Sequence, residues 1–397
     1  MSSIFKWPRQ PRRSAGMPKQ TKGYPLIAFQ GPGEANWSNG ASGALAKEGF
    51  ARNPVVYRCV RMLSEAAASM PLLLYDSDQE ALDHPVLGLL RQPNAHQSGA
   101  GFFEALYGHL LVNGNAYVHA ISLESQVREL HLLRPDKIET VFDDAGWPIA
   151  YDYVTSHRRQ RLDALGEPKP LLHIPLFNPS SDFEGLPPLA AAHMALDLHN
   201  AASRWNKALL DNSARPSGAL VYTSAEGANL TQDQFERLKS ELEQGYSGAS
   251  RAGRPMLLEG GLDWKAMAYS PKDMDFMEAR NGAARDIALA FGVPPMLLGI
   301  PGDNTYANYS EANRAFWRQT VLPLAARVTA SLGNWLASWH NGKLRLDFDR
   351  DAVEALGADR DALWKRVGEA TFLTIDEKRA AVGYGRAEPG FSPLNGE

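Results

Sequence analysis

Three carboxylates alternate in the last fifth of the chain, at Asp347, Asp349 and Asp351. Side chains at every second position of a strand share one face. With Glu311, two of them, Asp347 and Asp349, could hold a divalent ion that activates water, as in a metal-dependent nucleic-acid hydrolase. The same alternation is more typical of a strand whose acidic face meets solvent. Both interpretations stay open at this point.

The other side chains that could do chemistry stand alone. His193 and His199 are six positions apart, too far round a helix to share one metal ion. Residues 245–248 approach a nucleophile elbow but lack its second glycine. Cys59 is the single cysteine and lies on the apolar side of a helical pattern, so we interpret it as a small buried hydrophobe. We expect no catalytic residue, no metal and no cofactor, which favours a structural subunit over an enzyme.

Length and charge bound the remaining possibilities. The chain has 397 residues, enough for two or three domains, and a formal net charge of −4. Proteins that grip duplex DNA by its phosphates usually carry a basic surplus, so any contact with DNA is expected to be weak overall. No window approaches about 18 consecutive apolar residues, so no membrane-spanning helix is expected. Residues 1–24 contain six Lys or Arg and no acidic residue, and we expect a disordered basic tail there.

Residues 25–186 show helical patterns first and strand patterns afterwards. Asn53 and Pro54 form a cap and first-turn proline at the start of the first helix. Helices are expected at 53–70, 84–91 and 98–112, and strands at 72–75, 116–121, 129–134, 137–142, 149–155 and 171–175. Helices followed by a meander of strands predict an α+β domain.

Two long helices flank a small module in the middle of the chain. One alanine-rich helix is predicted over 187–212, and another over 270–292, which begins with a capping box at Ser270. At about 1.5 Å per residue they would span roughly 39 and 31 Å. Residues 213–269 predict a strand–helix–strand–strand unit that is too small to be a domain by itself. We expect it to pack on copies of itself.

The last third of the chain contains a turn-rich segment, a third long helix and a strand. Residues 301–309, at the end of the segment 293–309, are polar and contain no Lys or Arg. Ser310 is expected to cap a helix that runs to about residue 339, and Pro323 should kink that helix because it removes a backbone hydrogen bond. The region 310–349 is thus a kinked helix and a returning strand at 344–349. Helices at 352–370 and 374–382 complete the fold.

Several short motifs occur in a fixed order along the chain. They are NPVVYRCV at 53–60, HPVL at 84–87 with PN at 93–94, GNAY at 114–117, LRP at 133–135, RPSG at 215–218, GRPMLLEGG at 253–261 and FGVPPMLLG at 291–299. Each motif alone is weak. Their order and spacing over roughly residues 50–385 resemble the portal protein family of long-tailed (siphovirus-type) bacteriophages and of prophage-derived gene transfer agents.

The resemblance implies a dodecameric ring at one capsid vertex of a virion or phage-like particle, assembled in the host cytoplasm. In that α+β portal fold, the wing would be 25–186, the two-helix stem 187–212 with 270–292, the small α/β clip 213–269, and the short helical crown with the C-terminal tail 350–397. Double-stranded DNA would pass through the ring during packaging and ejection. The implied protein partners are the terminase large subunit, the head–tail adaptor and the major capsid protein, with no membrane.

The resemblance also implies two sets of contact residues. The tunnel loop facing the DNA would present Asp303, Asn304, Thr305, Tyr306, Asn308 and Tyr309, and the clip interface would present Phe235, Leu238, Leu242, Tyr246, Met256, Leu258 and Trp264. A loop without cations suits a channel that must not hold its cargo, because Lys and Arg contacts to phosphates supply most nonspecific affinity. A nonviral scaffold or adaptor with long helices and a small interaction module is the remaining alternative.

Overall fold

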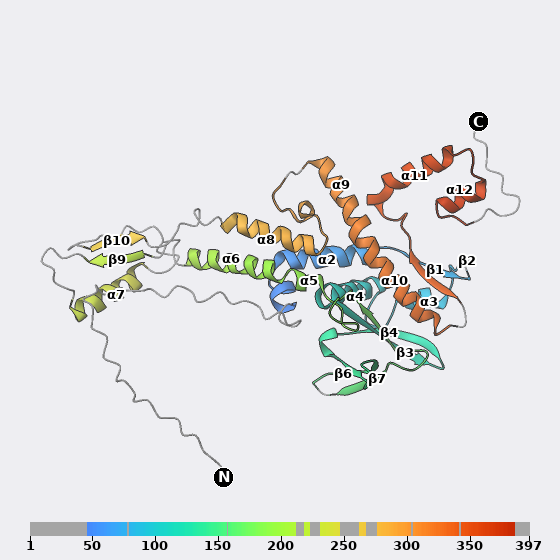
Figure 1. Cartoon of the computed structure of the whole chain (residues 1–397), viewed down its shortest axis with the longest axis horizontal. Helices are drawn as coiled ribbons and strands as arrows, with labels where there is room; N and C mark the ends of the chain where they lie inside the picture. The colour runs from blue at the N-terminus through green and yellow to red at the C-terminus, as the bar shows by residue number, and fades with distance from the viewer. Residues whose placement is uncertain are drawn as a thin grey trace, which may run out of the picture. The chain divides into compact units, whose positions relative to one another are not determined.

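A computed structural model describes residues 46–77, 79–156, 158–211, 218–222, 231–246, 262–266, 276–302, 305–340 and 343–385 (Figure 1). Its contacts divide the chain into two units. The larger unit comprises Ala35–Arg204 with Asp275–Glu397, and the smaller comprises Met1–Glu34 with Trp205–Met274. The predicted basic tail, residues 1–24, lies outside the described residues.

Three helices form the centre of the larger unit: α2 (Pro54–Ala68), α4 (Gly99–Asn113) and α10 (Leu322–Ala337) (Figure 1). Helix α2 begins where predicted, with the Asn53 side chain as its cap, and its apolar residues recur at helical spacing to face the core. Cys59 is fully buried among them, and burial raises the pKa of its thiol to about 12. The interpretation of Cys59 as a buried hydrophobe is therefore confirmed.

The described strands of the larger unit form three small sheets rather than one meander. Strand β1 (Leu72–Asp76) pairs with β2 (Gln79–Glu80) and with β11 (Leu344–Phe348), so the predicted returning strand joins a strand from the beginning of the chain. Strand β3 (Asn115–Leu123) lies between β4 (Gln126–Leu133) and β8 (Leu171–Pro175). Only β5 (Ile138–Phe142), β6 (Pro148–Val154) and β7 (Arg159–Asp163) follow one another as a meander.

A buried carboxylate ties β6 to β7. Asp152 is 1% exposed, and its oxygens accept hydrogen bonds from Arg159 Nε at 3.0 Å and from Arg161 Nε at 2.9 Å. The hydrogen bond from Arg161, followed by that from Arg159, lowers the pKa of Asp152 to about 2. Strand β7 was not predicted, because its alternating Arg and Gln side chains carry little apolar signal.

The predicted helix over 187–212 is divided in two, which corrects the sequence interpretation. Helix α5 (Pro188–Ala191) ends at Ala192, whose backbone angles (φ −86°, ψ 2°) leave the helical region, and α6 (His193–Asp211) then begins. The His193 Nδ1 lies 3.1 Å from the carbonyl oxygen of Ala190 at this break. Helix α8 (Phe276–Ala290) matches the second predicted long helix, while its expected cap at Ser270 lies outside the described residues.

The smaller unit contains β9 (Gly218–Tyr222), α7 (Gln232–Tyr246) and β10 (Leu262–Ala266), and β9 and β10 form an antiparallel pair. Thr231 caps α7, since its hydroxyl accepts from Gln234 N and the Gln234 side chain accepts from Thr231 N. The strand predicted at 254–258 lies outside the described residues.

Short helices complete the larger unit: η1 (Ala46–Phe50), α3 (Pro85–Arg91), η6 (Glu354–Leu356), α11 (Gly357–Glu369) and α12 (Ile375–Ala381). Helix α12 begins with a full capping box between Thr374 and Glu377, in agreement with the predicted helix at 374–382. The helix predicted from residue 352 starts later, because η6 precedes it. Across the described ranges, no helix combines the length and apolar character that a bilayer crossing requires.

Candidate nucleic-acid interface

The segment predicted to approach DNA begins with a tight turn at the end of α8. Gly292 adopts φ +66°, and Val293 N donates to Ala288 O at 2.9 Å, as in a Schellman C-cap. The hydroxyl of Thr320 donates to Gly292 O at 2.7 Å, and a Cβ added at Gly292 would lie 2.8 Å from that hydroxyl. A glycine is therefore needed here for both its backbone angle and its missing side chain.

The segment is anchored on both sides before it enters the next helix. Ile300 is buried against Ala284 and Ala288 of α8, and its N–H donates to Pro295 O at 3.2 Å. Arg285 Nη2 donates to Pro301 O at 2.5 Å. Because residues 301–309 contain no cation of their own, their sequence does not indicate that an arginine of α8 lies at their base.

The third long helix begins earlier than predicted, and this corrects the position of the loop. Thr305, not Ser310, is the cap of α9 (Tyr306–Phe316): Thr305 is extended and its hydroxyl accepts from Asn308 N at 3.2 Å. Asn308 and Tyr309 are exposed and lie in the first turn of this helix rather than in a loop. Asp303, Asn304 and the side chain of Tyr306 lie outside the described residues.

The interruption predicted at Pro323 takes the form of a π-helical turn. Between α9 and α10, η5 (Trp317–Val321) replaces α-helical bonding, and Leu322 N donates to Trp317 O, five residues back. Pro323 has no N–H, and its ring would clash with an α-helical carbonyl one turn earlier. The wider π turn accommodates both constraints without ending the helix.

The arginines of α9 and η5 are paired with carboxylates. Arg314 donates to Glu311 at 2.6 Å and to Asp359 of α11 at 3.3 Å. Arg318 Nη1 lies 3.9 Å from Asp359, an exposed pair that contributes little to stability. The pairing matters more for the surface charge of the helix than for stability, because each carboxylate offsets the positive charge of the arginine beside it.

A buried polar cluster joins α2 to α6. Asn53 Oδ1 accepts from Val55 N and Val56 N, which fixes the orientation of its amide. Asn53 Nδ2 must then donate to His199 Nδ1 at 3.0 Å, and it also donates to Asn200 Oδ1 at 2.9 Å. His199 is therefore neutral, with its proton on Nε2. Burial, and secondarily the charge of Arg280 in α8, lowers the pKa of His199.

The predicted clip residues are only partly described. Phe235 and Leu238 lie on one face of α7 and are half-buried. Trp264 stands opposite Leu220 in the register of β9 and β10. The side chains of Leu242, Tyr246 and Trp264, together with Met256 and Leu258, lie outside the described residues, so the clip interface stays a prediction.

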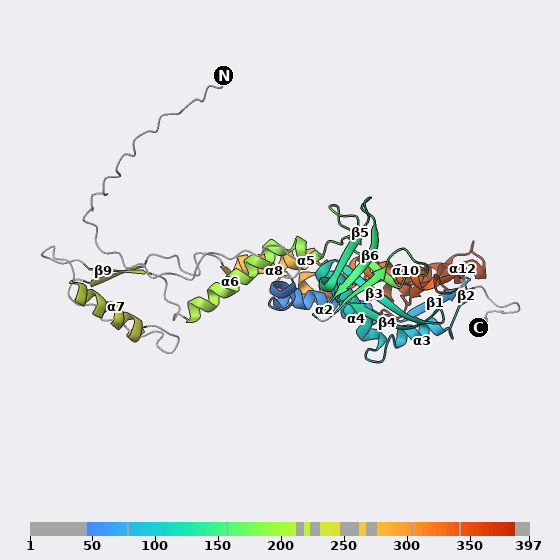
Figure 2. The ribbon, with the colours of Figure 1, turned by 90° about the horizontal axis from the view of Figure 1, so that it is seen from below.

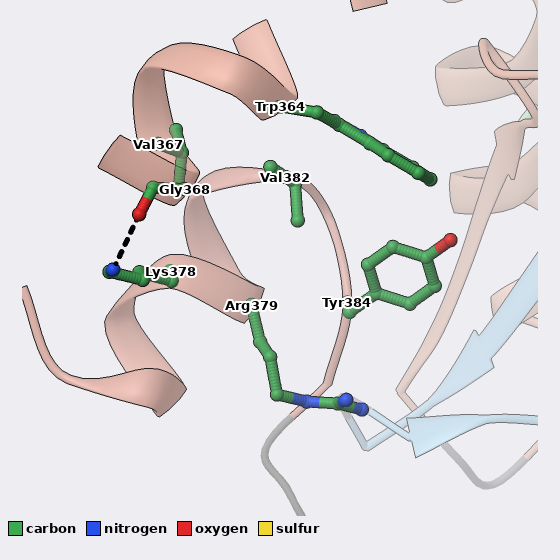
Figure 3. Close-up of a pocket in the computed structure, with 7 residues that line it drawn as sticks. All are labelled: Trp364, Val367, Gly368, Lys378, Arg379, Val382 and Tyr384. Carbon is green, nitrogen blue, oxygen red and sulfur yellow. Dashed lines mark hydrogen bonds between the residues drawn. The ribbon is translucent and has the colours of Figure 1, made fainter. Parts of the chain in front are cut away.

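A shallow pocket of about 240 Å³ lies between α11 and α12 (Figure 3). Trp364 and Tyr384 flank it with ring centroids 6.2 Å apart. Lys378 Nζ donates to Gly368 O at 2.9 Å, and Arg379 Nε donates to Gly385 O at 2.8 Å. Both cations are thus engaged with backbone carbonyls, and the pocket has the character of a helix–helix seam rather than of a reactive site.

The carboxylates considered as metal ligands have other partners. Asp347 accepts from Arg345 Nη1 at 2.9 Å, and Asp349 accepts from Asp351 N at 2.9 Å. Glu311 pairs with Arg314. On β11 the apolar residues are buried and Arg345 is exposed, as expected for a strand with one solvent face. Within the part of the chain that the structure describes, no cluster of three His, Cys, Asp or Glu could hold a metal ion.

The sequence is similar to those of phage portal proteins. Residues 54–383 match the family model of the phage portal protein. The portal protein of Enterobacteria phage HK97 is 27% identical over 335 residues, which cover 82% of this chain and 77% of that protein.

Solved structures of gene transfer agent (GTA) particles contain closer matches. A chain in the neck of an empty GTA particle, computed with C6 symmetry, is 52% identical with a TM-score of 0.71. A chain in the neck of a native GTA particle, computed with C12 symmetry, is 51% identical with a TM-score of 0.68. Each match covers 90% of this chain and 97% of the other.

Proposed function

The chain belongs to the phage portal protein family, and from that membership we propose that it forms the ring at one capsid vertex through which DNA is packaged and ejected. The observation that carries the proposal is the similarity to chains in the necks of GTA particles over nearly the whole length of both proteins. The C12 symmetry of one of those necks supports a dodecamer. The family is a structural one, and we propose no catalytic step for this member.

Exposed apolar side chains on the stem helices support assembly into a ring. Met194 and Leu198 lie one turn apart on α6 and are 65% and 43% exposed, and Leu289 on α8 is 77% exposed. Helices α6 and α8 lie side by side in both ribbon views (Figures 1 and 2). Apolar side chains that gather on a helix face usually mark an interface. A neighbouring copy of the chain is the partner that a ring supplies.

The first turn of α9 is our candidate for the DNA-facing surface of the channel. It presents Asn308 and Tyr309, while the next two arginines along the helix, Arg314 and Arg318, lie beside acidic residues. Contacts of this kind hold phosphates weakly, because they release few counterions from DNA. The charge pattern therefore supports a lining over which DNA can slide.

The smaller unit is our candidate for the docking site of the terminase large subunit and, later, of the head–tail adaptor. Its α7 carries Phe235 and Leu238 on one face, as expected for a helix that packs on one side and leaves the other to solvent. The wing of the larger unit is the corresponding candidate for contact with the major capsid protein.

Ring assembly can be tested by placing charge on the stem. The double variant Met194→Glu with Leu198→Glu should remain folded but lose the ring, as measured by mass photometry and negative-stain imaging. The matched control is Leu82→Glu with Leu123→Glu, two sites that are 77% and 63% exposed elsewhere on the same unit. Rings of normal size in the stem variant would overturn the proposed interface.

The channel surface can be tested in the same rings. Tyr309→Lys adds a cation at an exposed site, so assembly should be normal while DNA packaging slows. Packaging is measured as DNA protected from nuclease in assembled particles. Unchanged packaging at low salt, where phosphate contacts are strongest, would remove the first turn of α9 from the channel.

A further inference from the structure

Three aromatic side chains form an exposed patch on the wing, at some distance in sequence from any predicted site. Phe142 ends β5, Trp147 precedes β6, and Phe183 lies in the loop after β8. The ring centroid of Phe183 is 5.6 Å from that of Phe142 and 5.6 Å from that of Trp147. Phe142 and Trp147 remain 44% and 64% exposed. The β5–β6 hairpin projects from its unit (Figure 2).

The patch is held in shape by hydrogen bonds rather than left to move. Asp143 Oδ1 accepts from Trp147 N at 2.7 Å and from Ala145 N at 3.0 Å, which fixes the hairpin turn. On the other side, Ser181 Oγ accepts from Glu184 N at 3.0 Å, and Gly185 N donates to Asn115 Oδ1 at 2.8 Å. Rigid exposed aromatics bind a partner at a low cost in conformational entropy. This preorganisation is what a binding surface needs.

The rim of the patch is acidic. The segments 142–147 and 176–187 contain four carboxylates, those of Asp143, Asp144, Asp182 and Glu184, and no Lys or Arg. Asp144, Asp182 and Glu184 are exposed. A partner that fits both features carries apolar or aromatic side chains among cations.

One segment of this chain has that composition. Residues 1–24 hold six of the 41 Lys and Arg and none of the 45 Asp and Glu, so the rest of the chain carries 35 basic against 45 acidic residues, a formal charge of −10. The same segment contains Phe5 and Trp7 beside Lys6 and Arg9. No other stretch of the chain of that length is basic throughout and free of acidic residues.

Residues 1–45, which precede the first described residue, are long enough for residues 1–24 to reach the aromatic patch. The described residues begin at Ala46, in η1, and η1 packs on α2 of the unit that carries the patch. An extended chain spans at most about 3.5 Å per residue, so 45 residues could reach roughly 150 Å. Reach is therefore ample for the patch of the same subunit or of a neighbour.

We propose that residues 1–24 form an arm that docks on the aromatic patch of Phe142, Trp147 and Phe183 in an assembled copy of this protein. Cations of the arm face the acidic rim, and Phe5 and Trp7 pack against the three rings. The arm thereby places its cations on an acidic protein surface rather than in the channel.

The first test measures how fast trypsin cleaves the arm in full-length protein, because the six cations of the arm are its cleavage sites. Trp147→Ser with Phe183→Ser should speed cleavage at Arg12 and Arg13 by about fivefold or more, the effect of losing a central contact residue. Asp144→Asn with Asp182→Asn should speed it by about two- to fivefold, as for exposed ion pairs. The hydrogen bonds that fix the hairpin turn come from Asp143 and are kept in this variant, and neither variant adds a trypsin site.

The matched controls are Leu82→Ser with Leu123→Ser, and Glu80→Gln with Asp83→Asn, at exposed positions away from the patch. Both should behave as wild type. Equal cleavage rates in all five proteins would overturn the proposal. Ring assembly is measured on the same samples, so a failed arm contact can be told apart from a failed ring.

The second test is a disulfide between the arm and the rim. Ser3→Cys with Asp144→Cys should cross-link on mild oxidation, while Ser3→Cys with Leu82→Cys should not. Cys59 is buried and its thiol is not ionised near neutral pH, so it should not form a disulfide in this assay. In mixtures of the two single variants, a cross-linked dimer assigns the arm to a neighbouring subunit, and a cross-link only within the double variant assigns it to the same one. If neither the cross-linked dimer nor the cross-link within one subunit forms, the proposal is overturned.

Discussion

Replacing Asn53 by aspartate should reverse the way in which His199 contributes to the pH dependence of stability. In the native protein Asn53 Nδ2 donates to His199 Nδ1, so a protonated imidazole would bring two donors together. The variant keeps an oxygen to cap α2 but places an acceptor opposite His199 Nδ1. A neutral imidazole then fits poorly with its present tautomer, and a protonated one fits well.

The sign of each effect follows from the direction in which the pKa moves. The pKa of His199 is lowered in the folded protein, so its contribution is fully present above about pH 6.5, the unfolded value, and is lost as the pH falls below it. In Asn53→Asp the new carboxylate should raise that pKa above about 6.5. The contribution is then fully present below pH 6.5 and is lost as the pH rises through the raised value. A tenfold change in the acid dissociation constant corresponds to about 1.4 kcal/mol.

At neutral pH the variant should also be less stable overall. Asn53 is 1% exposed, and the change removes the amide that donates to the buried His199 Nδ1 at 3.0 Å. A buried acceptor that loses its donor costs about 1–3 kcal/mol, which is the expected loss of stability at pH 7.5. At pH 5.5 the loss should be smaller, by up to about 1.4 kcal/mol for a tenfold fall in the acid dissociation constant of folded His199.

The assay is urea unfolding of full-length protein at pH 5.5, 6.5 and 7.5. The control is His199→Gln, whose carbonyl oxygen can still accept from Asn53 but does not titrate. Other partly buried histidines, His109, His119, His173 and His340, also have lowered pKa values. Their contributions cancel when variants are compared. Equal pH slopes in wild type, Asn53→Asp and His199→Gln would refute the hydrogen-bond assignment.

Two further substitutions test the turn after α8 and the sheet of β5, β6 and β7. Gly292→Ala should destabilise the protein more than Gly299→Ala in thermal unfolding. Both glycines have a positive φ, which costs an alanine about 1–2 kcal/mol, but only at Gly292 would the added Cβ also meet Thr320. Equal losses would argue against that contact. Asp152→Asn should lower the melting temperature at pH 7. The difference in melting temperature from wild type should shrink as the pH falls from about 4 towards 2, because a carboxylate with a lowered pKa loses its stabilising effect as it becomes protonated over that pH range. A difference that persists at pH 2 would show that the ion pairs with the two arginines are not its cause.

The sequence predicted those elements whose signals are local. Asn53, Ser98, Thr231 and Thr374 were each recognisable beside the start of a helix, and each caps one. The contacts that join distant elements carried no such signal. Asn53 and His199 are 146 positions apart, and the sequence around either residue gives no sign that the two are in contact. Likewise the pairing of β1 with β11 depends on how the helices between them pack.

The error at Ser310 shows why the boundary of the channel segment was harder to predict than the existence of the helix. Two hydroxyl residues, Thr305 and Ser310, precede apolar helical spacing, and capping propensity alone does not choose between them. The structure selects Thr305, whose backbone is extended and whose hydroxyl accepts from Asn308 N. The polar residues that follow are thereby moved from a loop onto a helix, where their spacing is fixed.

The distribution of charge connects the channel with the arm. A ring that lets DNA slide must avoid a strong positive field along its path, yet the chain keeps 41 cations. On the described part of α9 and η5 the arginines face Glu311 and Asp359, which lowers the field locally. Residues 1–24 hold six Lys or Arg and no acidic residue. If that segment docks on the acidic aromatic patch of Phe142, Trp147 and Phe183, its charge is neutralised by protein rather than presented to DNA.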